Sequence, residues 1–183
     1  GKNIGEKKEQ VSPVMLASVP TNKTTILLQS ASIHVEYGKI KARARVIFDT
    51  GSQRTFISKR LASQLNCVPI CKENICISSF GSTHSHISQF ELVSVGLHAS
   101  NEIFDVEALV ADSISVPIPM KMDSNWMRHP MIRDLHLADK YDEDTLYIDM
   151  VIGNDYYSSL VTGRVFKEDG MLAMESKFGW LLS

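Results

Sequence analysis

From about residue 24 onward, apolar and polar residues alternate in short runs, which predicts a chain built mainly of β-strands. Residues 33–37 alternate with the period of two that places successive side chains on opposite faces of a sheet. Gly38-Lys39 follows where a hairpin would turn, and the next strand, 42–48, alternates at first and then becomes fully apolar, as a strand does when it enters a core. Further strands are predicted at 24–28, 75–77, 86–93, 104–110, 147–153, 165–166, 171–174 and 180–182. Short strands at such regular intervals indicate a β-barrel or a sandwich.

Helical spacing is confined to three short segments. Ser58 can cap the first, in which apolar residues between 61 and 65 recur at the helical period before Asn66 ends it. The second is predicted near 131–137, and the third at 155–161, ended by Gly163. The pattern alone therefore predicts a mostly β chain with two or three short helices.

The chain divides into three kinds of segment. Residues 1–22 are polar and charged and are predicted to be a flexible N-terminal segment, followed by one domain over 23–183. Within that domain, 115–147 is rich in Pro, Met and His and interrupts the strand rhythm, so we interpret it as an insertion. The first residues lack an initiator Met and the apolar core of a signal peptide, which indicates a piece cut from a longer polypeptide.

Composition and charge exclude several classes of protein. The 183 residues are 44% hydrophobic, as in an ordinary globular domain. A net charge of −2, from 19 Lys+Arg against 21 Asp+Glu, argues against direct nucleic-acid binding. No apolar run reaches the roughly 18 residues that a membrane span needs, so no membrane contact is expected.

Three cysteines cannot form a complete disulfide framework, so we expect reduced thiols and a cytoplasmic, intracellular location. Cys67, Cys71 and Cys76 are followed by His84 and His86, which suggests a zinc-dependent nucleic-acid module as an alternative. Their spacings match none of the usual paired zinc patterns, so no metal site and no cofactor are predicted.

The segment 46–52 carries the strongest chemical motif. An apolar strand delivers Asp49 directly into a turn made by Thr50, Gly51 and Ser52. A carboxylate at the end of a buried strand must be hydrogen-bonded, paired or catalytic, and the Thr and Ser hydroxyls are available to hold it. An aspartic protease needs this arrangement, because two such turns face each other and their carboxylates share one proton. The alternative is that Asp-Thr-Gly is ordinary hairpin punctuation.

About 100 residues later a second apolar run ends in Gly153 and opens a helix at Asn154-Asp155. In single-lobe aspartic proteases a strand of this kind crosses behind the catalytic loop. An acid is favoured in the first turn of a helix by the helix dipole, which gives Asp155 a structural role. The alternative assigns Asp155 as the second catalytic carboxylate.

Five segments together carry a resemblance to a known family, and they span residues 27–183. They are Leu27-Leu28-Gln29-Ser30-Ala31, Phe48-Asp49-Thr50-Gly51-Ser52-Gln53-Arg54-Thr55-Phe56-Ile57-Ser58, Leu137-Ala138-Asp139, Val151-Ile152-Gly153-Asn154-Asp155-Tyr156-Tyr157 and Phe178-Gly179-Trp180-Leu181-Leu182-Ser183. On these residues the chain resembles retropepsin-like aspartic proteases, and among them the protease of Bel/Pao-type LTR retrotransposon polyproteins. The resemblance implies a single-lobe closed β-barrel with a flap hairpin and two or three short helices.

The resemblance also implies roles for individual residues. Asp49 would be the catalytic carboxylate, Thr50 would make hydroxyl hydrogen bonds across two subunits, and Gly51 would shape the turn, with Ser52 as further support. The flap over the substrate would be 75–88. Its tip would be formed by Ser79, Phe80, Gly81 and Ser82.

With one Asp-Thr-Gly turn per chain, the second carboxylate must come from another copy, so a C2 homodimer is expected. The expected function is an aspartic endopeptidase that processes a Gag-Pol-type retroelement polyprotein and grips extended peptides through their main chain. The alternative is a catalytically silent module with the same fold, kept for dimerisation or peptide binding.

Overall fold

The computed structural model describes residues 27–78, 85–115 and 117–183, and this part of the chain is mostly β. Its strands are β1 (Ser30–Tyr37), β2 (Ile40–Phe48), β3 (Phe56–Ser58), β4 (Cys71–Ser78), β5 (Ser85–His98), β6 (Ile103–Ala111), β7 (Ile118–Lys121), β8 (Asp142–Leu146), β9 (Met150–Ile152), β10 (Val161–Glu168), β11 (Met171–Ser176) and β12 (Gly179–Leu182). Its helices are α1 (Lys59–Gln64), α2 (Ser124–Met127), α3 (Pro130–Arg133) and α4 (Asn154–Leu160). The predicted N-terminal segment, 1–22, lies outside the described part.

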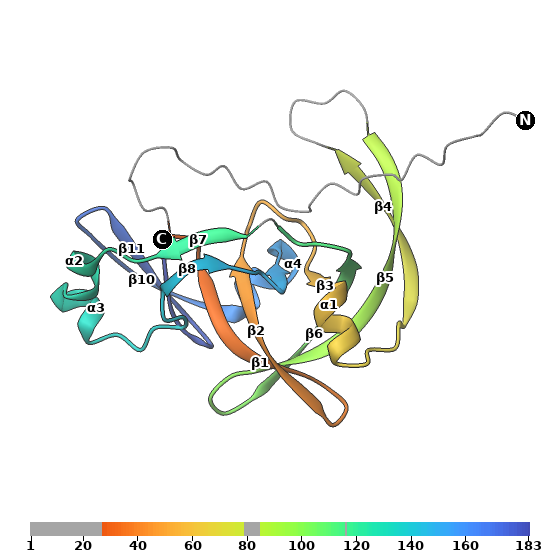
Figure 1. The fold of residues 1–183 in the computed structure, drawn as a ribbon, viewed down its shortest axis with the longest axis horizontal. Coiled ribbons are helices and arrows are strands. Elements are labelled where there is room, and N and C mark those ends of the chain that lie inside the picture. The colour runs from red at the N-terminus through yellow and green to blue at the C-terminus, as the bar shows by residue number, and fades with distance from the viewer. Residues whose placement is uncertain (1–26, 79–84, 116) are drawn as a thin grey trace, which may run out of the picture.

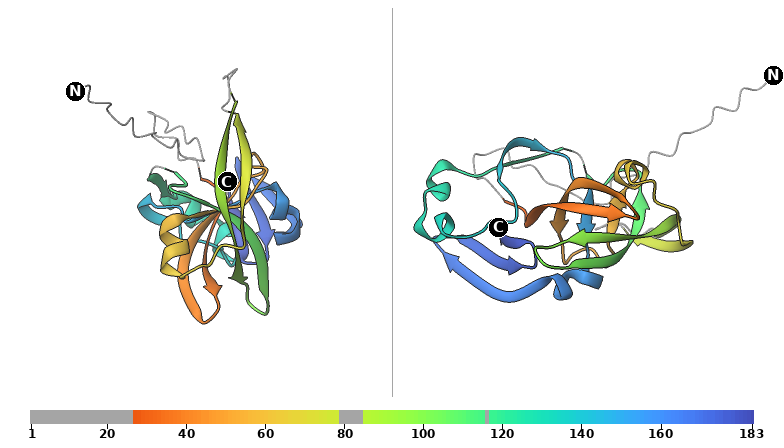
Figure 2. Two further views of the ribbon diagram at one scale, coloured as in Figure 1. Left: turned by 90° about the vertical axis from the view of Figure 1, so that its right-hand side faces the viewer. Right: turned by 90° about the horizontal axis from the view of Figure 1, so that it is seen from below.

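Six strands close into a barrel in the order β1-β2-β9-β3-β6-β5, and the closing contact pairs Val35 of β1 with Leu97 of β5 (Figure 1). The fourth strand, β4, pairs with β5 outside this ring. The β4–β5 hairpin projects from the barrel as a long arm (Figure 2, left). The structure thus confirms the closed barrel and the small number of short helices expected from the sequence, and the β4–β5 hairpin lies where the flap was predicted. The helix that was not predicted is α2.

Alternation along the strands produces two apolar layers, one on each face of the barrel wall. Val46 and Phe48 of β2 belong to the first layer, and Ile47 between them belongs to the second. Both faces of this strand end are therefore covered, which explains why the end of β2 is fully apolar. The strand begins after a tight turn at Gly38, whose φ of +58° is a conformation that glycine adopts without steric cost.

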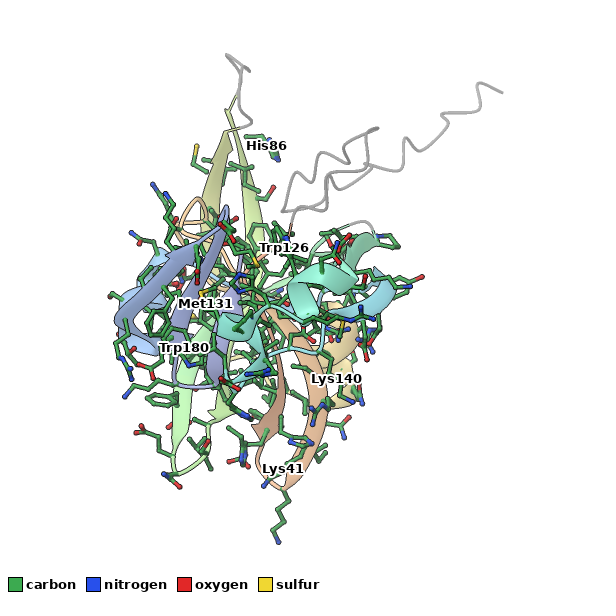
Figure 3. The ribbon with its side chains drawn as sticks, turned by 90° about the vertical axis from the view of Figure 1, so that its left-hand side faces the viewer. Lys41, His86, Trp126, Met131, Lys140 and Trp180 are labelled. Carbon is green, nitrogen blue, oxygen red and sulfur yellow. The ribbon has the colours of Figure 1, made fainter. Side chains whose placement is uncertain are left out.

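Residues 112–149, which include the predicted insertion, pack against the second apolar layer. Ile132, Tyr141 and Leu146 are buried there, together with Trp180 of β12. Trp126 and Met131 pack against the same layer and are labelled with Trp180 in Figure 3. The helices α2 and α3 and the sheet β10-β11-β12 occupy one end of the molecule, opposite α1 and the β4–β5 arm (Figure 2, right).

A buried ion pair ties this segment to the barrel. Asp139 accepts hydrogen bonds from Arg45 Nε (2.8 Å), Arg45 Nη2 (2.9 Å) and Ser30 Oγ (2.8 Å). Burial disfavours the charge of Arg45, but hydrogen bonds to Asp139 and Glu143 outweigh it and raise the pKa of Arg45 above its ordinary value. Asp139 of the Leu137-Ala138-Asp139 segment therefore links β2 to the predicted insertion.

Several predicted boundaries differ from the observed ones. The helix predicted at 131–137 is α3, which ends at Arg133 because Asp134 already caps it. The strand predicted at 147–153 is limited to Met150–Ile152. The helix predicted at 155–161 is α4, which ends at Leu160. Gly163, at a φ of +84°, does not end this helix but lies inside β10 at a register shift.

The strand predicted at 24–28 is also wrong in the part that the structure describes. Leu27 and Leu28 precede β1 without belonging to a strand, and 24–26 lie outside the described residues. Leu27 is buried in the second apolar layer, so its hydrophobicity reflects core packing rather than strand pairing.

Candidate active site

Asp49 follows directly after β2 and is positioned by the neighbouring strand. The Phe48 amide donates to Gln29 O (2.9 Å), and the Asp49 amide donates to Ile152 O at the end of β9 (3.0 Å). The ladder between β2 and β9 therefore continues up to the residue that carries the carboxylate. The Asp49 side chain is half-buried, whereas Thr50 and Gly51 are exposed.

The turn after Asp49 holds the carboxylate through a main-chain group. The Gly51 amide donates to Asp49 Oδ1 (2.9 Å), and the Ser52 amide donates to Asp49 O (3.2 Å). A Cβ atom at Gly51 would lie 3.1 Å from Asp49 Oδ1, closer than almost all real Cβ contacts. Glycine at this position thus lets the amide and the carboxylate approach each other.

The Ser52 hydroxyl has a different partner from the one the sequence suggested. It donates to Arg54 O (2.7 Å) and not to the carboxylate. Ser52 therefore braces the loop. Thr50 is exposed, and its predicted role across two subunits stays a prediction.

Gly153, between β9 and α4, packs directly behind the loop. A Cβ atom at Gly153 would lie 2.4 Å from Arg54 O and 2.9 Å from Ser52 O, so no larger residue fits without displacing the loop backbone. The Asn154 amide donates to Ser52 O (2.8 Å) and completes the contact. The second apolar run of the sequence thus crosses behind the Asp49 loop.

Asp155 lies in the first turn of α4 and supports the same loop through Thr55. Its Oδ1 accepts from Thr55 Oγ1 (2.7 Å), and its Oδ2 accepts from the Thr55 amide (2.9 Å). The buried Thr55 hydroxyl oxygen also accepts from the Gly153 amide (3.1 Å). Each carboxylate oxygen of Asp155 therefore accepts a hydrogen bond from Thr55. This agrees with the predicted structural role of Asp155.

An ion pair joins the Asp49 loop to the projecting arm. Arg54 Nη1 lies 2.7 Å from Glu73 Oε2 on β4, and Arg54 Nε lies 3.8 Å from Asp155 Oδ2. The hydrogen bond to Glu73 raises the pKa of Arg54, and the same bond lowers the pKa of Glu73. No individual role of Thr55, Arg54 or Glu73 was predicted from the sequence. Arg54 and Thr55 could have been suspected because they follow the Asp-Thr-Gly motif in the sequence. Nothing in the sequence around Glu73 indicates its contact with Arg54.

The arm presents different residues on its two faces. Ile75 and Ile77 pack against the second apolar layer, whereas the side chain of Ile87, on the opposite face, is 73% exposed. The predicted flap-tip residues Ser79, Phe80, Gly81 and Ser82 lie outside the described residues.

The cysteines do not converge on one point. Cys71 and Cys76 lie five positions apart on β4, so their side chains leave opposite faces of the strand. Burial raises the pKa of the Cys67 thiol and favours its neutral form, which is not the form that binds metals. Figure 3 places His86 on the projecting arm, and His84 lies outside the described residues. Within the described ranges, no three His, Cys, Asp or Glu side chains gather as metal ligands would.

The helices in the described part of the chain are four to seven residues long, and none of them qualifies as a membrane-spanning segment.

Comparison with known proteins identifies the family of this chain. No curated protein matches the chain. A protein-family model described as "Putative peptidase (DUF1758)" matches residues 34–183. The match begins in β1 and includes the Asp49 loop, the arm, α4 and the C-terminal sheet. Because it covers most of the sequence, the chain belongs to this peptidase family.

Proposed function

We propose that the chain is an aspartic endopeptidase, with Asp49 as its catalytic carboxylate. The observation that carries the proposal is the Asp49 loop: a half-buried carboxylate at the end of a barrel strand, bonded by the Gly51 amide and braced from behind by Gly153. This bracing limits the motion of the carboxylate, as catalysis by a positioned acid or base requires.

The chemistry needs two such carboxylates that share one proton. The ionised carboxylate removes a proton from a bound water, and the water oxygen bonds to the carbonyl carbon of the scissile peptide. The protonated carboxylate donates its proton to the carbonyl oxygen, giving a neutral tetrahedral diol. Collapse of the diol re-forms a carbonyl, breaks the C–N bond and transfers a proton to the leaving nitrogen. The products are one carboxyl and one amino terminus.

A homodimer supplies the second carboxylate in this proposal. Each chain holds one Asp-Thr-Gly turn, and both oxygens of Asp155, the other candidate, already accept hydrogen bonds from Thr55. The exposed position of Thr50 suits a hydroxyl that bonds across a two-fold axis. The protease domain would be 23–183, and 115–147 would be an insertion that packs onto its second apolar layer.

The proposed substrates are extended peptides at junctions of a retroelement polyprotein of the Bel/Pao type. The sequence resemblance supports this origin, and the β4–β5 arm beside the Asp49 loop supports binding of an extended chain. Cys67, Cys71 and Cys76 are all free thiols, which suits a reducing cytoplasm.

The test is cleavage of a pool of fluorogenic octapeptides by wild type, Asp49→Asn and the matched control Asp112→Asn, whose carboxylate is exposed. Asp49→Asn is expected to lose at least about 10²-fold in kcat/KM with an unchanged circular dichroism spectrum, because an amide cannot act as the base. The control is expected to retain full activity. Pepstatin is expected to inhibit wild type, and a chelator is not.

Assembly and pH give independent checks. Specific activity should rise with protein concentration until the dimer saturates, and added Asp49→Asn chains should inhibit wild type by forming mixed dimers. The pH profile should be bell-shaped with an acidic optimum, because the active form carries one proton on two carboxylates. Residual Asp49→Asn activity within about tenfold of wild type, or full activity of a strict monomer, would contradict the proposal.

A further inference from the structure

The ion pair between Arg54 and Glu73 connects the Asp49 loop directly to β4 of the projecting arm. Arg54 lies five residues after Asp49 in the catalytic loop, and Glu73 lies near the start of β4. Their closest atoms, Arg54 Nη1 and Glu73 Oε2, are 2.7 Å apart. The two side chains are 34% and 30% exposed, so water screens the pair only partly.

Arg54 is held firmly at its own end of the pair. Its carbonyl oxygen accepts from Ser52 Oγ (2.7 Å) and packs on Gly153, and its guanidinium also lies near Asp155. These contacts restrain both the main chain and the guanidinium of Arg54. Glu73 therefore pairs with a group whose position is fixed relative to Asp49.

The strand β4 is hydrogen-bonded to a neighbour along one edge only, although its Ile75 and Ile77 pack against the second apolar layer. Among the described strands it is the outer member of its sheet and pairs with β5 alone, outside the closed ring. Glu73 stands opposite Phe90, near the base of the arm, and five residues before the last residue of β4. A strand rises about 3.3 Å per residue, so the end of β4 lies about 17 Å from Glu73. A small rotation of β4 about Glu73 therefore displaces that end of the strand.

We propose that Arg54 and Glu73 are positioning residues that set the spacing between β4 and the Asp49 loop, and thereby the hold on an extended peptide. The inference rests on the proposed endopeptidase function. An extended substrate is held by main-chain hydrogen bonds, and these weaken steeply once the donor and acceptor separate or tilt. Neither residue takes part in the chemical step, so losing the pair weakens substrate binding while the carboxylate chemistry continues.

The kinetic test compares Arg54→Ala, Glu73→Ala and the double variant, on the octapeptide that wild type cleaves best. Each single variant is expected to raise KM by about three- to tenfold, the range for a partly exposed charged hydrogen bond, and to leave kcat within about twofold. The double variant is expected to match the singles, since the second change removes nothing further. The control pair Lys59→Gln with Asp112→Asn, an exposed ion pair at 3.7 Å, is expected to leave KM unchanged.

A second measurement does not depend on catalysis. Amide hydrogen exchange of β4 is compared between Asp49→Asn and Asp49→Asn with Glu73→Ala, and exchange along β4 is expected to accelerate by about three- to tenfold while β1 stays unchanged. Any one of three results would overturn the inference. These are unchanged exchange in β4, an unchanged KM, and effects of the two single variants that multiply in the double variant. Cleavage that survives Asp49→Asn would overturn the proposed function instead. Faster β4 exchange would then still support a positioning role of the Arg54–Glu73 pair.

Discussion

Thr55→Val tests whether the hydrogen bonds of Thr55 behind the Asp49 loop stabilise the fold. Thr55 is fully buried, and its hydroxyl both donates to Asp155 Oδ1 (2.7 Å) and accepts from the Gly153 amide (3.1 Å). Valine has nearly the same shape, so the change removes these two hydrogen bonds and leaves the packing of the side chain in place. Any loss of stability therefore reports the hydrogen bonds.

The expected loss can be estimated from the two groups left behind. A hydrogen bond to a charged acceptor contributes about 1.5–3 kcal/mol, and a buried amide without its acceptor costs about 1–3 kcal/mol. Asp155 keeps its bond from the Thr55 amide, and its side chain is 23% exposed, so water replaces part of what it loses. We therefore expect the free energy of unfolding to fall by about 2–4 kcal/mol.

The measurement is urea unfolding followed by circular dichroism, at one fixed protein concentration because dimerisation shifts apparent stability. Thr55→Ser is the matched control: it keeps the hydroxyl and loses one methyl group, at a cost of about 1 kcal/mol. If Thr55→Val proved as stable as Thr55→Ser or more stable, the hydroxyl would not be a structural link between the loop and α4.

Contacts of the same kind give three further predictions. Gly153→Ala should push the Asp49 loop away from residue 153, because Arg54 O, in the loop backbone, would lie 2.4 Å from the new Cβ; we expect about 1–3 kcal/mol lower stability by urea unfolding and at least about tenfold lower kcat/KM. Asp139→Asn should leave the Arg45 charge without its buried partner and cost about 3–5 kcal/mol in the same assay. Carboxyl-carbon NMR should show Glu73 titrating below its ordinary value of about 4.3, and Arg54→Ala should return it upward. Because the folded-state pKa is lowered, the contribution of this pair to stability is present above about pH 4.3 and is lost as the pH falls through the lowered pKa.

Features that depend on neighbouring residues could be predicted from the sequence. Alternation and the turn at Gly38 predicted β1 and β2, and Ser58 was recognised as the cap of α1, where its side chain accepts from the Leu61 amide. The apolar run before Asp49 marked the strand that carries the carboxylate, because a strand covered on both faces reads as a continuous apolar segment. These patterns are local because side-chain periodicity and capping act over a few residues.

Only the tertiary structure decided which distant residues meet. Thr55 binds Asp155, Arg54 pairs with Glu73, and separations of 100 and 19 residues leave no trace in local composition. The pairing of β3 with β9 in the barrel brings Thr55 and Asp155 together, whereas the pairing of β4 with β5, outside the closed ring, places Glu73 beside Arg54. The tertiary structure also shows that Ile132, Tyr141 and Leu146, from the irregular segment predicted to be an insertion, pack against the second apolar layer. Burial against that layer is a property of the assembled fold, since an apolar residue in a loop gains stability only from the surface that it covers.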